Sequence, residues 1–189
     1  MVNHRDSAEE AEQVVAEIAA LGGEAVSIRA DVTRPDEVAA LVADTEALWG
    51  SVDVLVHNAA LSYTITSYAD LHWEDLQDRI IREMQAAFLL TKAVTPGMVE
   101  RSYGRLVYLS TVVSRHPRAG MISLGVAKAA MDQFVRYVAL ELAVHGITAN
   151  VVAPIALEHV GTTVAAFACD GAGSTTGQWV PASDAWETH

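Results

Sequence analysis

His57 and Lys128 have side chains that can take part in catalysis, and the sequence singles both of them out. His57 follows the apolar run at 53–56, which predicts a strand, and ligands bind at the carboxyl ends of strands in open α/β sheets. Lys128 is one of only two lysines. An imidazole can transfer a proton near neutral pH, and an ammonium can stabilise a developing negative charge. We therefore expect acid–base or electrostatic chemistry at these residues; the simpler alternative is that His57 is a partly buried structural histidine.

Other kinds of catalytic centre have little support. The seven histidines never occur at the spacings of common zinc motifs, and no G-x-S-x-G nucleophile motif is present, so no metal is expected. The glycines at 171, 173 and 177 follow a predicted helix and precede a predicted strand, the reverse of the order in a dinucleotide-binding turn. They are expected to form a surface turn.

Strands and helices alternate along the predicted chain, as judged from helical spacing of apolar residues and short apolar runs. Thr33 is expected to cap the second helix. The expected order is helix 7–21, strand 24–30, helix 34–49, strand 53–56, helix 73–100, strand 105–110, helix 123–145, strand 147–153, helix 158–168 and strand 178–180. This alternation predicts one α/β domain, residues 1–189, with an open, mostly parallel sheet and helices on both faces.

The amino-acid composition restricts the kinds of binding partner and the cellular compartment that we expect. The 12 Lys and Arg residues are outnumbered by 24 Asp and Glu residues, and the net charge of -12 repels nucleic acids and anionic membranes. The single cysteine, Cys169, cannot form an intrachain disulfide, and the first residues contain no apolar signal core. No apolar run reaches the roughly 18 residues that span a bilayer. We expect a cytoplasmic protein with no nucleic-acid or membrane partner.

Four segments resemble the short-chain dehydrogenase/reductase superfamily, in that family's order. They are residues 53–60 (DVLVHNAA), 104–111 (GRLVYLST), 127–130 (AKAA) and 145–154 (HGITANVVAP). The resemblance extends from about residue 2 to 180 and implies a Rossmann-like fold. Residues 2–5 resemble the end of the family's second strand, so the first strand, its Gly-rich turn and its helix have no counterpart. The resemblance therefore predicts no nicotinamide cofactor and no cofactor-binding residues; Arg5 and Asp31, at family cofactor positions, are expected to be ordinary strand-end residues.

The family's catalytic positions have also changed. The resemblance places Leu124 where the family has its proton-donating Tyr, while Lys128 remains at the position of the Lys that lowers the pKa of that Tyr. Thr111 stands at the Ser position and Glu83 at the Asn position. A helical substrate lid after residue 154 is missing. The expected cleft is therefore formed by Glu83, Lys128, Thr111 and His57, in which Lys128 is either an electrostatic group or the partner of Glu83 in a structural ion pair, and Thr111 either binds substrate or caps a helix.

Three functions remain open at this point. The first is a cofactor-independent, non-redox enzyme on a reductase-derived fold, such as a cyclase, isomerase or lyase acting on an apolar, polyketide-like small molecule. The second is a catalytically inactive binding or partner subunit, and the third is a residual NAD(P)-dependent ketoreductase. A homo-oligomer, at least a dimer, is expected through the helices around 73–100 and 123–145, which carry apolar residues that a small domain cannot all bury: Ile80, Met84, Phe88, Phe134 and Leu140.

Overall fold

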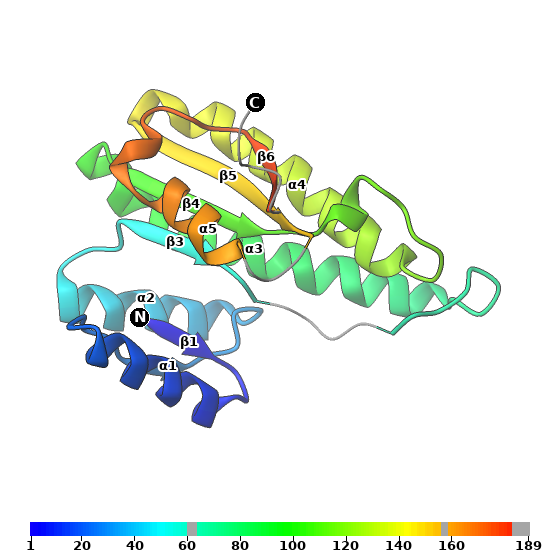
Figure 1. Ribbon diagram of the computed structural model, residues 1–189, viewed down its shortest axis with the longest axis horizontal. Coiled ribbons are helices and arrows are strands. Elements are labelled where there is room, and N and C mark those ends of the chain that lie inside the picture. Colours follow the sequence, from blue (N-terminus) through cyan, green and yellow to red (C-terminus); the bar gives the residue numbers. More distant parts are fainter. Residues whose placement is uncertain (60–63, 156–158, 183–189) are drawn as a thin grey trace.

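The computed structural model describes residues 1–59, 64–155 and 159–182, in which strands and helices alternate (Figure 1). The strands are β1 (Val2–His4), β2 (Ser27–Arg29), β3 (Val54–His57), β4 (Gly104–Leu109), β5 (Ile147–Pro154) and β6 (Trp179–Ala182). The helices are α1 (Ala8–Ala20), α2 (Pro35–Trp49), α3 (Trp73–Arg101), α4 (Ile122–Leu142) and α5 (Val160–Ala168), with short 3-10 turns at Val112–Ser114, Ala143–His145 and Asp170–Ala172. The α/β class predicted from the sequence is confirmed.

The strands form two parallel sheets, whereas a single sheet was expected. One sheet pairs β1 with β2, and the other has the order β3-β4-β5-β6. Strand β2 is also shorter than the predicted strand 24–30. Among the described residues, no backbone pairing joins β1 to β3, so each of these strands has one unpaired edge.

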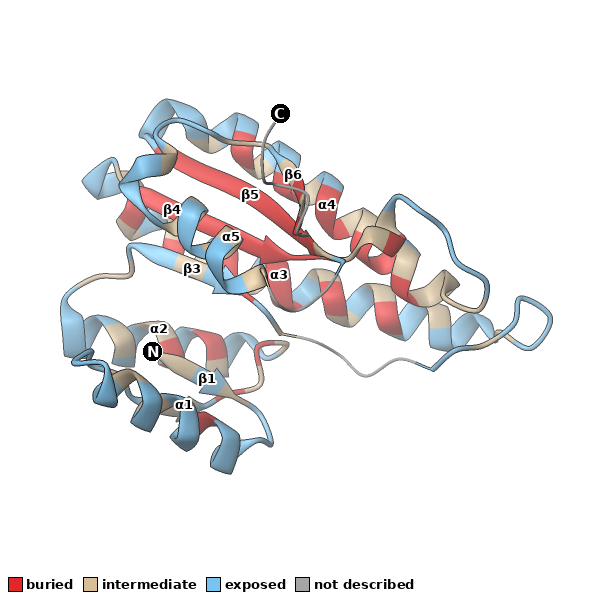
Figure 2. Cartoon of the chain, in the orientation of Figure 1, coloured by how far each residue is buried: buried red, intermediate tan, exposed pale blue. Residues whose placement is uncertain are grey.

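The four-stranded sheet is covered on both faces. Because side chains alternate along a strand, Leu106 and Tyr108 of β4 face α3 and α4, whereas Val107 and Leu109 pack with α5 on the other side. Strands β4 and β5 are therefore buried along almost their whole length, while β3 is largely exposed (Figure 2). The continuous apolar runs in the sequence reflect this two-sided burial.

The two-stranded sheet joins the rest of the protein through helix packing. Val38 and Leu41 of α2 pack against Ala86 and Leu90 of α3 in a second apolar cluster. The helix start differs from the prediction: Arg34 occupies the N-cap position of α2, and the Thr33 hydroxyl instead donates a hydrogen bond to Asp31 at 2.7 Å. The backbone N–H of Thr33 bonds the same carboxylate, so Thr33 serves the turn that precedes the helix.

The long helix α3 is continuous through Pro96. None of the helices within the described ranges is long and apolar enough to cross a membrane.

Candidate functional site

A buried cluster of three charged side chains lies between α3 and α4. The Nζ atom of Lys128, on α4, is 2.6 Å from a carboxylate oxygen of Glu83, on α3. The other oxygen of Glu83 is 3.4 Å from the guanidinium of Arg79, one helical turn earlier. Lys128 also donates a hydrogen bond of 2.7 Å to the carbonyl of Leu109, at the end of β4. The close packing of α3 against α4 thus brings together the two residues that the resemblance placed in one cleft.

This cluster is closed to solvent. Only 1% of the Glu83 surface is exposed, and Lys128 and Arg79 are each 7% exposed. Removing charges from water is costly unless they are paired, so the carboxylate between two cations is what makes this burial tolerable. The ammonium of Lys128 is held by Glu83 and a backbone carbonyl, which is the contact that the ion-pair alternative expects.

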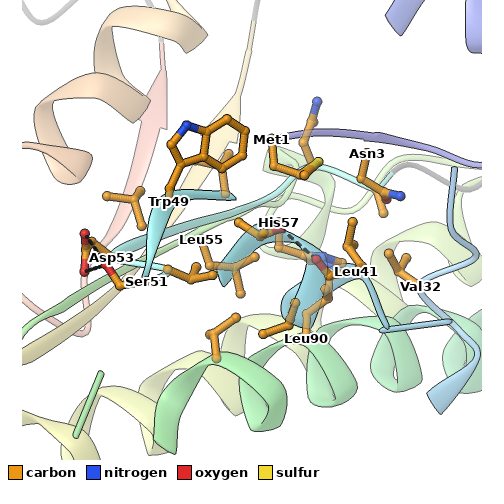
Figure 3. Close-up of a pocket in the computed structure, with 18 residues that line it drawn as sticks. Met1, Asn3, Val32, Leu41, Trp49, Ser51, Asp53, Leu55, His57 and Leu90 are labelled. Carbon is orange, nitrogen blue, oxygen red and sulfur yellow. Dashed lines mark hydrogen bonds between the residues drawn. The ribbon is translucent and has the colours of Figure 1, made fainter. Parts of the chain in front are cut away.

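His57 is enclosed and uncharged near neutral pH. It ends β3, is 1% exposed, and its ring meets the ring of Tyr108 edge to face with 5.9 Å between centroids. Burial, with a smaller contribution from the positive charge of Lys128, lowers the pKa of His57 to about 3. Neither ring nitrogen has a hydrogen-bond partner within the described part of the chain. The structure thus shows a fully buried ring at the end of β3 (Figure 3), whose nitrogens lack a partner there, whereas the simpler alternative from the sequence was a partly buried, hydrogen-bonded histidine.

Thr111 uses its hydroxyl locally. Its side-chain oxygen accepts a hydrogen bond of 3.3 Å from the backbone N–H of Val113 and so caps the short turn after β4. Of the two roles expected for Thr111, the structure contains the capping one. The structure therefore brings only some of the four predicted site residues together. Glu83 and Lys128 are in contact, and the charge of Lys128 lowers the pKa of His57. The Thr111 hydroxyl accepts a hydrogen bond from within its own loop.

Leu124 occupies the first turn of α4 and is 8% exposed. It lies one helical turn before Lys128, on the same face of the helix. An aliphatic side chain at this place has no proton to donate. The ammonium of Lys128 accordingly faces the carboxylate of Glu83 in place of a hydroxyl.

Two buried charged residues near this region were not predicted from the sequence. Arg79 precedes Glu83 by four residues, and this spacing on a predicted helix was a usable signal. Asp132, on α4, accepts a hydrogen bond of 2.6 Å from the Ser114 hydroxyl. Burial raises the pKa of Asp132, while hydrogen bonds from Ser110 and Ser114 oppose that shift. Asp132 thereby ties α4 to the loop after β4, and nothing in its sequence spacing indicated this.

A cavity of about 300 Å³ lies at the carboxyl ends of β1 and β2 and reaches Glu83. Two of its charged residues contact close neighbours: Arg5 pairs with Asp6 at 2.6 Å on the surface, and Asp31 accepts hydrogen bonds from Thr33. The bonds from the hydroxyl and backbone N–H of Thr33 lower the pKa of Asp31. The contacts of Arg5 and Asp31 are thus with neighbours at their own strand ends.

The described residues do not fit a dinucleotide pyrophosphate at the helices that follow β1 and β2. A helix N-terminus binds an anion through its free N–H groups and its positive dipole end. Here the first turn of α1 carries Glu9 and Glu10, and that of α2 carries Asp36 and Glu37. These carboxylates occupy the favourable positions for negative charge and would repel a phosphate. Nor do the described residues include a cluster of His, Cys, Asp and Glu that could hold a metal ion.

Comparison with known proteins places this geometry in context. A family model described as enoyl-(acyl carrier protein) reductase matches residues 2–167. A 3-oxoacyl-[acyl-carrier-protein] reductase from Synechocystis sp. is 38% identical over 154 residues, which cover 82% of this chain and 62% of that protein. The reductase FabG from Staphylococcus epidermidis is 34% identical over 155 residues, covering 81% and 62%. This chain therefore spans about 62% of the length of these curated relatives.

A solved structure supports the fold. The crystal structure of NAD+-bound xylitol dehydrogenase superposes with a TM-score of 0.85 over 95% of this chain and 86% of that chain, at 21% identity. At this level of identity, the likeness establishes the common fold.

Proposed function

The chain belongs to the short-chain dehydrogenase/reductase superfamily, and from that premise we propose that it is a reductase-type domain that acts by binding and does not reduce carbonyls with its own residues. The observation that carries this proposal is the buried contact of 2.6 Å between Lys128 and Glu83, one helical turn from Leu124. A lysine held by a carboxylate, with a leucine at the proton-donor position, has no hydroxyl to activate.

The electrostatics of the cluster support this proposal. A group that transfers protons in catalysis must reach the substrate and have a suitable pKa. Glu83 is enclosed between Lys128 and Arg79, and His57 is neutral because burial lowers its pKa to about 3. These groups stabilise one another and the junction of α3, α4 and β4.

The second candidate is an active carbonyl reductase. It is favoured by the relatives, which are named as 3-oxoacyl-[acyl-carrier-protein] reductases and match four-fifths of this chain. The presence of Lys128 and of a hydroxyl residue, Thr111, at the family positions agrees with that origin. The acidic first turns of α1 and α2 are unfavourable for phosphate, but the family's pyrophosphate-binding turn precedes the strand that residues 2–5 resemble, so these two helix starts do not decide against the second candidate.

The non-redox enzyme expected from the sequence has narrower support. It rests on Glu83, which lines the 300 Å³ cavity together with Asp6 and Asp31 and is the carboxylic group among the four residues of the expected cleft. The named relatives are reductases, which favours an oxidoreductase origin over a cyclase, isomerase or lyase.

The deciding experiment is a reduction assay. The purified chain is mixed with NADPH or NADH and an acetoacetyl thioester, and cofactor absorbance is followed. We expect no turnover by the wild type, by Leu124→Tyr or by the matched control Leu124→Phe, which adds the ring without the hydroxyl. Turnover by the wild type would establish the second candidate. Turnover by Leu124→Tyr alone would mean that residue 124 is the sole block, contrary to the proposed phosphate repulsion.

A further inference from the structure

Two arginines lie close to each other next to Trp179 of β6. The guanidinium of Arg115, in the loop after β4, stacks over the ring of Trp179, with 4.1 Å between the guanidinium carbon and the ring centroid. Arg136 lies on α4 and repels this guanidinium. The pKa of Arg115 is lowered by burial and then by the positive charge of Arg136, while Asp132 opposes the shift. We call Arg115 and Arg136 the arginine pair.

The arginine pair has no carboxylate partner within the described residues. Both side chains are exposed, and neither forms an ion pair there. Asp132 attracts Arg115, but it is 7% exposed and accepts a hydrogen bond of 2.6 Å from Ser114. Residues 102–131 contain no aspartate or glutamate, although the chain has 24 acidic and 12 basic residues. Like charges without a counter-ion repel each other, so this place favours a negatively charged occupant.

The sequence supplies such an occupant directly after β6. Residues 183–189 (SDAWETH) follow Ala182 and lie outside the residues that the structure describes. They include Asp184 and Glu187 but no lysine or arginine. Their attachment to β6, the strand that also holds Trp179, keeps them near the arginine pair. A short tether of this kind gives an effective concentration of about a millimolar or more, so weak contacts suffice for binding.

The length of this segment is sufficient for it to reach the arginine pair. Trp179 and Ala182 are the first and last residues of β6, and they lie about 10 Å apart at roughly 3.3 Å per residue. The chain from Ala182 to Glu187 can span up to about 17 Å when extended. The side chain of Trp179 packs on the face of the sheet that α3 and α4 cover. A chain that turns toward α4 after Ala182 can therefore return to the level of Trp179.

We propose that residues 183–189 fold back along β6 and bind the arginine pair through the carboxylates of Asp184 and Glu187. Guanidinium groups suit this role because they donate paired hydrogen bonds to a carboxylate. The bound segment would cover the loop after β4, which carries Thr111 as well as Arg115, and would compete with other anions for the arginine pair. The inference is independent of whether the domain reduces carbonyls.

The direct test is hydrogen exchange of the full chain at neutral pH and low salt, followed in the peptic fragment that contains residues 183–189. A free peptide of these residues gives the exchange rate in the absence of a binding site. We expect slower exchange in the protein than in the free peptide, and Arg136→Gln should speed it about three-fold. The matched control is Arg29→Gln, an exposed arginine on β2, which should leave the rate unchanged.

A double-mutant cycle tests the contact itself. Asp184→Asn with Glu187→Gln removes both carboxylates from the segment and should also bring its exchange close to that of the matching free peptide. If these carboxylates bind Arg136, then adding Arg136→Gln to this variant should have little further effect. Arg136 is used here because it is exposed and makes no contact with the ring of Trp179 among the described interactions, so its replacement leaves the stacking of Arg115 in place.

The proposal is overturned if residues 183–189 exchange as fast in the protein as in the free peptide, if Arg136→Gln behaves like Arg29→Gln, or if the effects in the cycle add in full. Inorganic phosphate tests the other source of negative charge. If the segment exchanges freely while millimolar phosphate raises the melting temperature of the wild type but not of Arg136→Gln, the arginine pair would bind a free anion and the proposal would be wrong.

Discussion

Removal of the charge of Glu83 should destabilise the protein more than removal of the charge of Lys128. Glu83 stands between two cations, at 2.6 Å from Lys128 and 3.4 Å from Arg79. Glu83→Gln leaves two buried cations with no carboxylate between them. Lys128→Met fills a similar volume and leaves the pair between Glu83 and Arg79. The two substitutions each remove one charge from the cluster, but their consequences differ.

The magnitudes follow from burial. Breaking a buried ion pair by removing one partner costs about 3–5 kcal/mol, and this range applies to Glu83→Gln because the carboxylate is 1% exposed. For Lys128→Met we expect about 1.5–3 kcal/mol, the value of a hydrogen bond to a charged group, since Glu83 keeps its second cation. In the double variant the costs should be less than additive, with a coupling of about 0.5–3 kcal/mol.

The assay is urea denaturation at neutral pH, followed by circular dichroism. If the m-value is unchanged, the shift of the denaturation midpoint reports a change in the free energy of unfolding. The control is Glu74→Gln, an exposed glutamate in the first turn of the same helix, which should cost at most about 1 kcal/mol. A cost for Glu83→Gln equal to or below that for Lys128→Met, or simple additivity in the double variant, would refute the argument.

Three further outcomes are expected. Because the pKa of His57 is about 3 in the folded protein and near 6.5 when unfolded, the unfolded state binds more protons between these values. Lowering the pH from 7 to 5 should therefore reduce the free energy of unfolding of the wild type by about 2 kcal/mol more than that of His57→Asn. Equal shifts of the urea midpoint in the two proteins would contradict this. Millimolar NADPH should leave the melting temperature unchanged, and a clear rise would show binding to the native state. Light scattering at micromolar concentration should give at least a dimer, which Leu140→Lys on the exposed face of α4 disrupts; a monomeric wild type would exclude it.

The sequence predicts the strands and helices of this fold well where burial is two-sided. Strands β4 and β5 are covered by α3 and α4 on one face and α5 on the other, so their apolar runs are unambiguous. The division into two sheets was not predictable in the same way. It depends on which edges pair across long sequence separations, whereas periodicity reports only on local backbone.

The sequence predicted which residues form the candidate site better than it predicted the chemistry of those residues. The resemblance placed Glu83 and Lys128 together, and the structure joins them in a buried ion pair. It did not indicate that His57 is neutral, because the pKa of His57 depends on complete burial against Tyr108 and on the charge of Lys128. Those influences come from α4 and β4, which are distant from residue 57 along the chain.

His57 is coupled electrostatically to the ion-pair cluster of Lys128 and Glu83. It ends β3 and is 1% exposed, and its pKa is lowered first by burial and then by the positive charge of Lys128. The ion pair and the buried histidine therefore form one electrostatic unit, in which a change in the charge of Lys128 also changes the pKa of His57.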